Sequence, residues 1–246
     1  MKLIRILLFT LSTLPVWAQP VEGVVTYERV QYWTKINARL PFLSQEEKDR
    51  MKMTWGSSDG YKEKTVLYFN ENQSKYTKNT EATGGYSWSK EEDIFYRDFA
   101  NGTQKSLLAM LGKTYLLDDS LPEPHWKIMN QIKDISGHVC MLAVMDDTVR
   151  KQTIKAWFAD DIPVMAGPEK FFGLPGLILE VDVNDGDAII TAIKVEMKPV
   201  TEEIKLPKKL KGKKLTNAQY ESLISNHIQV SQKAYRNPYW DMRYWY

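Results

Sequence analysis

The sequence predicts a mainly β fold: a curled antiparallel sheet, as a half-open barrel or a sandwich, with one or two short helices. About ten short segments alternate apolar and polar residues, as strands with one buried face do, and turn residues separate them. Clear helix-start signals occur at two places, Ser44 and Thr216, where the capping residue is followed three positions later by Glu or Gln.

Residues 1–18 are predicted to be a secretory signal peptide, because Lys2 and Arg5 precede a short apolar run that ends at Ala18. The run is too short to cross a bilayer, and no later segment reaches about 18 apolar residues. We therefore expect an exported protein without a transmembrane span in its mature chain. Its expected location is the periplasm or the periphery of the outer membrane.

The charge balance argues against a nucleic-acid partner. The whole chain has 33 Lys and Arg against 31 Asp and Glu, and the two counts become equal without residues 1–18. The remaining 228 residues are enough for one sizeable core. We expect an antiparallel β domain over 19–204, followed over 205–246 by a Lys-rich segment, a helix and an aromatic tail.

The strands and helices are predicted in order from local patterns. The predicted strands are 23–33, 64–70, 73–78, 93–99, 105–110, 115–118, 127–132, 137–145, 151–158, 177–183 and 189–197. The capping boxes predict helices over 45–53 and 217–232. Residues 80–90, rich in Thr, Gly and Ser, are expected to form an exposed loop.

The most apolar strand of the chain is expected to leave a type II turn at Leu174-Pro175-Gly176-Leu177, with a positive φ at Gly176. Asn184-Asp185-Gly186-Asp187 then has the residues of a hairpin turn. A calcium loop starting at Asp182 is disfavoured, because its glycine comes one residue early and the closing Glu is missing. The two core-facing stripes are predicted to be Leu177, Leu179, Val181 and Val183, and Ile189, Thr191, Ile193, Val195 and Met197.

The single cysteine, Cys140, cannot form an internal disulfide and lies in an apolar segment that is predicted to be a buried strand. We interpret it as a core thiol. A Cys-His-Met copper site is the alternative, but the two-residue period of a strand does not favour it.

The segment Gly173-Leu174-Pro175-Gly176-Leu177-Ile178 resembles the signature of the GLPGLI family, a group of cell-envelope proteins from Bacteroidetes. Further matching pieces follow the family's order: Trp126, 135–140, 156–158, 162–163 and 167–168. The resemblance implies a cell-envelope protein. It transfers no catalytic residue, because the family has no established activity.

No nucleophile elbow, zinc-protease helix, phosphate-binding loop or dinucleotide-binding turn occurs in the chain. We therefore predict no catalytic residue, cofactor or metal ligand. A hydrolase that uses a pair of carboxylates stays a third alternative, because the two carboxylates of such a pair have no fixed spacing in the sequence. Two tripeptides resemble acceptor motifs for O-glycosylation in Bacteroidetes, and their candidate sites are Ser120 and Thr148.

The C-terminal tail is unusually aromatic, and exposed Tyr and Trp often anchor protein interfaces. We expect a non-enzymatic binding or accessory module whose tail either folds back or contacts an envelope partner, such as an outer-membrane protein. The alternative is a carrier of a lipid-like or amphipathic ligand on the concave face of the sheet. The candidate partner contacts are Tyr235, Tyr239, Trp240, Tyr244, Trp245 and Tyr246.

Overall fold

The computed structural model describes residues 21–58, 60–78 and 93–239. In these ranges twelve strands form one sheet in the order β12-β6-β5-β4-β3-β2-β1-β11-β10-β9-β8-β7, antiparallel except for the β12–β6 pair. The strands are β1 Gly23–Gln31, β2 Tyr61–Phe69, β3 Gln73–Lys78, β4 Ile94–Asp98, β5 Thr103–Met110, β6 Lys113–Ser120, β7 Lys127–Ile135, β8 His138–Asp147, β9 Gln152–Ala159, β10 Leu177–Val183, β11 Ala188–Met197 and β12 Lys213–Leu215.

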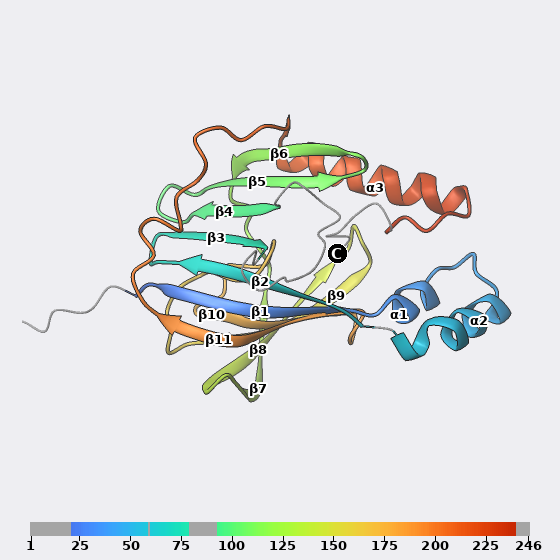
Figure 1. Cartoon of the computed structure of the whole chain (residues 1–246), viewed down its shortest axis with the longest axis horizontal. Helices are drawn as coiled ribbons and strands as arrows, with labels where there is room; N and C mark the ends of the chain where they lie inside the picture. Colours follow the sequence, from blue (N-terminus) through green and yellow to red (C-terminus); the bar gives the residue numbers. More distant parts are fainter. Residues whose placement is uncertain (1–20, 59, 79–92, 240–246) are drawn as a thin grey trace, which may run out of the picture.

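The sheet curls, with β3 to β6 on one side and β7 to β11 on the other (Figure 1). Buried residues of β1 to β6 and of β8 to β11 belong to one hydrophobic cluster, so the two halves enclose a common core. Helix α3 (Asn217–Lys233) lies beside β6, while α1 (Trp33–Ala38) and α2 (Gln45–Trp55) form a pair at one end. A short 3-10 turn, η1 (Gly56–Ser58), follows α2. The predicted mainly β fold is confirmed.

Both predicted capping boxes are confirmed. The Ser44 hydroxyl accepts a hydrogen bond from the Glu47 amide at 3.2 Å, and the Glu47 carboxylate accepts one from the Ser44 amide at 2.8 Å. Thr216 and Gln219 make the equivalent pair at the start of α3. The helix α1 was not predicted. The predicted strand 23–33 extends to Trp33, whereas in the structure a helix begins at that residue.

The predicted positive φ at Gly176 is wrong. The positive φ in this segment lies at Gly173, at +87°, and Gly176 has none. What excludes a side chain at Gly176 is proximity. A Cβ there would collide with the backbone of Ala159, the last residue of β9, and of Asp160, which follows it. The loop between β9 and β10, residues 160–176, is therefore pressed against the strand that precedes it. We call this segment the motif loop.

The hairpin of β10 and β11 is confirmed, with positive φ at Asn184, Asp185 and Gly186. Its predicted one-sided burial is wrong. In β10 both faces are buried over most of the strand, including Ile178 on the face predicted to be polar. In β11 the buried residues are Ala188, Ile190 and Ala192, on the face opposite to the predicted stripe. Beyond the register shift in the pairing with β1, Val195 of the predicted stripe packs against the core.

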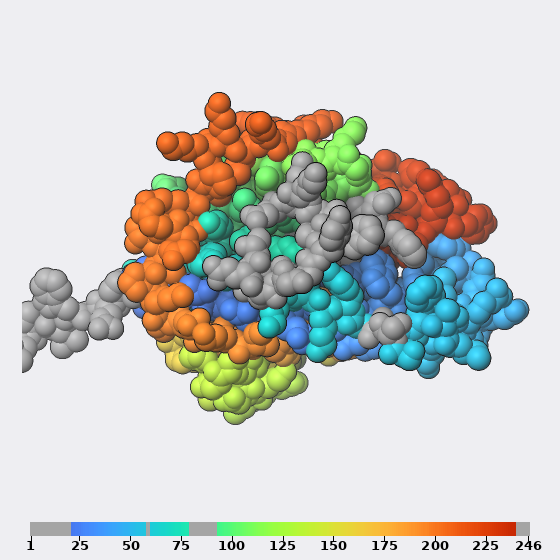
Figure 2. All heavy atoms as spheres, viewed as in Figure 1, coloured from blue at the N-terminus to red at the C-terminus, as the bar shows by residue number. Residues whose placement is uncertain are grey.

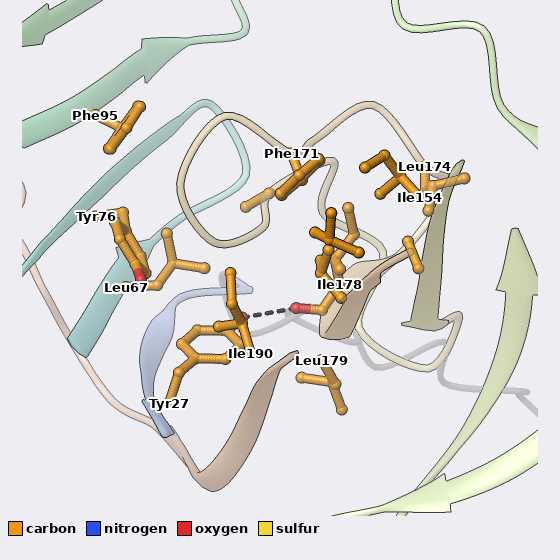
Figure 3. Packing of buried hydrophobic residues seen from close by; sticks show 14 of the residues in the cluster. Tyr27, Leu67, Tyr76, Phe95, Ile154, Phe171, Leu174, Ile178, Leu179 and Ile190 are labelled. Atoms are coloured by element: carbon orange, nitrogen blue, oxygen red, sulfur yellow. Dashed lines mark hydrogen bonds between the residues drawn. The ribbon is translucent and has the colours of Figure 1, made fainter. Parts of the chain in front are cut away.

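The motif loop explains why β10 is buried on both faces. Ile178 faces the interior between the motif loop and β1, where its carbonyl accepts a 2.6 Å hydrogen bond from the Tyr27 hydroxyl (Figure 3). Phe171 and Leu174 of the motif loop cover it from one side. The motif loop thus supplies a second layer over the strand that it leads into.

The Lys-rich segment joins the sheet through β12, which pairs in parallel with β6. Helix α3 packs its buried residues Tyr220, Ile224 and Ile228 into the main cluster. None of the helices within the described ranges has the length and hydrophobicity of a membrane span. The predicted signal peptide and the loop at 80–90 lie outside the described residues.

Candidate binding site beneath helix α3

A cavity of about 240 Å³ lies where the first turns of α3 meet the motif loop, β5, β6 and the segment that links β6 to β7. This volume equals roughly eight water molecules at about 30 Å³ each. Most of its wall is apolar, and we call it the α3 cavity. Its principal apolar lining residues are Leu117, Pro124, Trp126, Met145, Phe171 and Phe172.

The polar part of the wall is built around the N-terminus of α3. The Gln104 side-chain amide donates to Asn217 Oδ1 at 2.7 Å, and the Asn217 backbone amide donates to Asp119 Oδ2 at 2.7 Å. The second bond is a charge-assisted cap, and it lowers the pKa of the Asp119 carboxyl. Strands β5 and β6 therefore hold the start of α3 in place over the cavity.

The motif loop is tied to the opposite wall. Trp126 Nε1 donates to the carbonyl of Phe172 at 2.8 Å. The next residue, Gly173, needs its positive φ and has no room for a Cβ, which would lie 2.5 Å from Pro124 Cγ. The glycine that opens the family-like segment is thus required by the contact between the motif loop and the wall of the α3 cavity.

Two charged residues, Lys170 and Glu221, line the α3 cavity, and Asp147 and Arg150 form ion pairs with them. We call these four residues the Lys170 cluster. Lys170 Nζ donates to Asp147 Oδ2 at 3.2 Å, and Arg150 donates to the same oxygen at 3.0 Å. Arg150 also forms a two-point pair with the Glu221 carboxylate at 2.8 and 3.1 Å. The buried guanidinium of Arg150 thereby fastens α3 to the turn between β8 and β9.

The electrostatics of the Lys170 cluster are set by burial and by mutual attraction. Burial, reinforced by the charge of Arg150, lowers the pKa of Lys170 to about 8, although Asp147 and Glu221 act in the opposite direction. For Arg150 the effect of burial is outweighed by Glu221, Tyr220 and Asp147 together, and its pKa rises. For Asp147 burial is outweighed by Lys170 and Arg150, and its pKa falls. Lys170 is the member closest to losing its charge near neutral pH.

The residue before Lys170 belongs to a second buried group on the other side of the motif loop. Glu169 is fully buried with a positive φ of 51°, and its carboxylate accepts from Arg29 Nε at 3.0 Å. Arg97 donates to the Glu169 carbonyl and lies 4.7 Å from the centroid of the Phe172 ring. Burial lowers the pKa of Arg97 to about 9. Phe172 therefore separates a buried guanidinium from the α3 cavity.

The family-like segment borders this site without supplying its polar groups. Leu174, Leu177 and Ile178 are buried in the core, Pro175 is exposed, and Gly176 contacts β9. Gly173 and the preceding Phe172 lie at the wall of the α3 cavity.

The described part of the aromatic tail folds back onto the protein. Asn237 donates to Asn37 of α1 at 2.7 Å, and the Tyr235 ring meets Phe42 edge-on at 6.1 Å between centroids. Tyr239 is half-buried against the core, whereas Tyr235 remains 76% exposed. In the view of Figure 2 the atoms of α3 lie next to those of the α1–α2 pair. Trp240, Tyr244, Trp245 and Tyr246 lie outside the described residues.

Three other residues that the sequence analysis named as candidates do not line the α3 cavity: Cys140, Ser120 and Thr148. Cys140 is buried in β8, and burial raises the pKa of its thiol to about 12, as for an inert core residue. Within the described ranges no group of three or more His, Cys, Asp or Glu residues could hold a metal ion. Ser120 and Thr148 are exposed, and the Asp before each contributes to the surroundings of the cavity.

Sequence reasoning missed the Lys170 cluster, whose members come from β8, the β8–β9 turn, the motif loop and α3. One local signal was available. Glu169 and Lys170 are adjacent charges between Gly167-Pro168 and Phe171-Phe172, and charges inside so apolar a segment usually have buried partners.

Comparison with known protein families finds a match that overlaps this region. Residues 145–180 match the model of a family described as a protein of unknown function (Porph_ging). The match includes Met145, Lys170, Phe171 and Phe172 of the cavity wall and Asp147 and Arg150 of the Lys170 cluster. No curated protein matches the chain.

Among solved structures, two of PNGF-II, in the C2 and P21 space groups, each align with a TM-score of 0.55 at 12% identity, over 83% and 82% of this chain. The alignment spans about a third of PNGF-II, 32% in both cases, and shows a similar fold. An uncharacterized conserved protein from Thermus thermophilus aligns over 80% of this chain and 90% of its own, at 7% identity with a TM-score of 0.39, too low to support an inference.

Proposed function

We propose that this chain is an exported cell-envelope protein of the GLPGLI type that binds a small amphipathic ligand in the α3 cavity, with an apolar body and one anionic or carbonyl head. The observation that supports this most is the combination of an aromatic, apolar wall with one lysine, Lys170, at its edge. Ligand sites commonly join an apolar cavity to a few polar groups that fix orientation.

The charges at the cavity favour an anionic head over a cationic one. The Glu221 carboxylate is neutralised by two hydrogen bonds from Arg150, and Asp147 accepts from both Arg150 and Lys170. The Lys170 ammonium, by contrast, makes one hydrogen bond within the described residues.

The size of the cavity limits the ligand to a short chain or a single ring. Each buried methylene contributes about 0.8 kcal/mol, or about fourfold in Kd. Calorimetric titration should therefore show hexanoate binding more tightly than butanoate by up to about 15-fold. At pH 7 hexylammonium should bind most weakly of the three ligands, because its positive head would be repelled by the positive charge of Lys170.

The variant Lys170→Met tests the role of the head group while keeping the length of the side chain. It should weaken hexanoate at least tenfold and leave hexanol nearly unchanged, since hexanol relies on the apolar wall. Lys155→Met, on the surface of β9, is the matched control and should bind hexanoate like the parent. The proposal fails if hexanoate does not bind, or if it binds Lys170→Met as tightly as the parent.

A second candidate function is docking to an envelope partner through the end of the molecule formed by α1, α2 and Tyr235. Helix α2 buries none of its residues, and Met53, Trp55 and Tyr61 expose 87%, 62% and 61% of their surface. Large apolar side chains this exposed favour an interface when they share one surface. Native mass spectrometry of protein extracted from its own envelope would test it. The same partner mass should be lost in a Met53→Ser, Tyr235→Ser variant that keeps its melting temperature.

A further inference from the structure

Lys170 has the surroundings of a reactive amine as well as those of a binding group. It is the lysine among the residues that line the α3 cavity. Its side chain is 26% exposed, and Nζ lies 5.7 Å from the centroid of the Phe171 ring. Its single hydrogen bond within the described ranges goes to Asp147 Oδ2, which also accepts a hydrogen bond from Arg150. This anchoring leaves Nζ able to turn toward a ligand in the cavity.

From this placement we propose that Lys170 captures carbonyl ligands covalently, forming an imine with a short apolar aldehyde seated in the α3 cavity. The inference rests on the proposed function, since it names the reaction of the same site and the chemical class that it would take. Lysines in apolar pockets or beside another cation are the ones that form such adducts.

The reaction balances within the site. The neutral amine of Lys170 adds to the aldehyde carbon, and a C–N bond forms as the carbonyl π bond opens to a carbinolamine. Loss of the hydroxyl with the second amine proton then gives the imine and one water molecule. The Asp147 carboxylate, 3.2 Å from Nζ, is placed to accept a proton from nitrogen and return it to the departing hydroxyl.

The charge state of Lys170 makes the addition practical near neutral pH. With its pKa at about 8, about a tenth of the amine is neutral at pH 7, roughly 300 times the fraction of an ordinary lysine. The charged groups that act on Nζ are Asp147 and Arg150, from the end of β8 and its turn, and Glu221 from α3. Arg150 lowers this pKa, whereas Asp147 and Glu221 raise it.

The experiment is reductive trapping of the full chain with hexanal and sodium cyanoborohydride at pH 7, followed by peptide mapping. Lys170 should gain a hexyl group at least tenfold faster than Lys155 and Lys205, surface lysines paired with Asp185 and Glu202. Hexanoate should protect Lys170 and leave the two control lysines unprotected. Because all three lysines are compared in one folded protein, no variant is needed for the main result.

Two variants sharpen the result. At pH 9, where the amine of Lys170 is largely neutral with or without the Asp147 charge, Asp147→Asn should slow the labelling of Lys170 through loss of the proton acceptor. Asp146→Asn, one residue earlier in β8 and paired with Thr153, should not slow it. If Lys170 reacts no faster than Lys155, or if hexanoate gives no protection, the imine proposal is overturned. Should hexanoate still bind by calorimetry in that case, the ligand-binding function stands without the covalent step. If hexanoate does not bind either, both proposals fail.

Discussion

Arg29 Nε donates to Glu169 Oε1 at 3.0 Å, joining the first strand of the sheet to a residue 140 positions later. Both side chains are buried. The pair holds the motif loop against β1 from the inside, and the same loop forms the wall of the α3 cavity on its other side. The geometry of the candidate site therefore depends on an ion pair that is not part of it.

Glu169→Gln should destabilise the protein by about 3–5 kcal/mol, the usual cost of removing one partner of a buried ion pair. The reason is that the charge of Arg29 would remain buried without this carboxylate. Urea unfolding measures the change. Glu202→Gln, which breaks an exposed pair with Lys205, is the control and should stay within about 0.5 kcal/mol of the parent. Equal effects of the two substitutions would contradict the role given to Glu169.

Gly176→Ala should cost about 2–3 kcal/mol, because the new methyl group would meet backbone atoms of β9 that cannot turn aside. The same change at Gly56, after α2, meets only Lys52 Cγ at 3.8 Å and should be neutral or slightly stabilising. Thermal unfolding of the two variants separates the effects. A Gly176→Ala protein as stable as Gly56→Ala would show that the motif loop can move away from β9.

Arg150→Lys should loosen α3, since an ammonium cannot reproduce the two-point bond to Glu221 and the bond to Asp147. We expect a loss of about 1.5–3 kcal/mol. Hydrogen exchange should become faster in the first turns of α3 and little changed in β1 and β2. Arg50→Lys, in an exposed pair with Glu46 on α2, serves as the control. Unchanged exchange in α3 would mean that its apolar contacts alone hold it.

Lys170 should make the free energy of unfolding depend on pH in the alkaline range. Its folded-state pKa is about 8, below the unfolded value of 10.5, so between these values the unfolded chain binds more protons than the folded one. Stability should therefore rise with pH across this range relative to Lys170→Met, in which the titrating amine is absent. Urea midpoints of the two proteins at pH 7, 8.5 and 10 measure the difference. A difference that is constant or moves the other way would place the pKa of Lys170 at or above its ordinary value.

Local patterns in the sequence predicted the elements well, because their causes are local. The Ser44 and Thr216 capping boxes and the turn at Asn184-Asp185-Gly186 are settled by residues within four positions of each other. The buried face of β11 was mispredicted because both of its faces contain apolar residues. The face that points inward depends on pairing with β1, where a bulge lies at Thr26 and Tyr27.

Patterns along the chain were enough to predict the mainly β class, most strand positions, the two capped helices and the hairpin that follows the family-like segment. Three features became visible only in the folded protein: the burial of β10 on both faces, the positive φ at Gly173 rather than Gly176, and the meeting of Asp147, Arg150, Lys170 and Glu221. The difference lies in the separation along the chain of the residues that interact. Turns and caps depend on neighbours along the chain, whereas a cavity and its charges depend on which distant segments the curled sheet and α3 bring together.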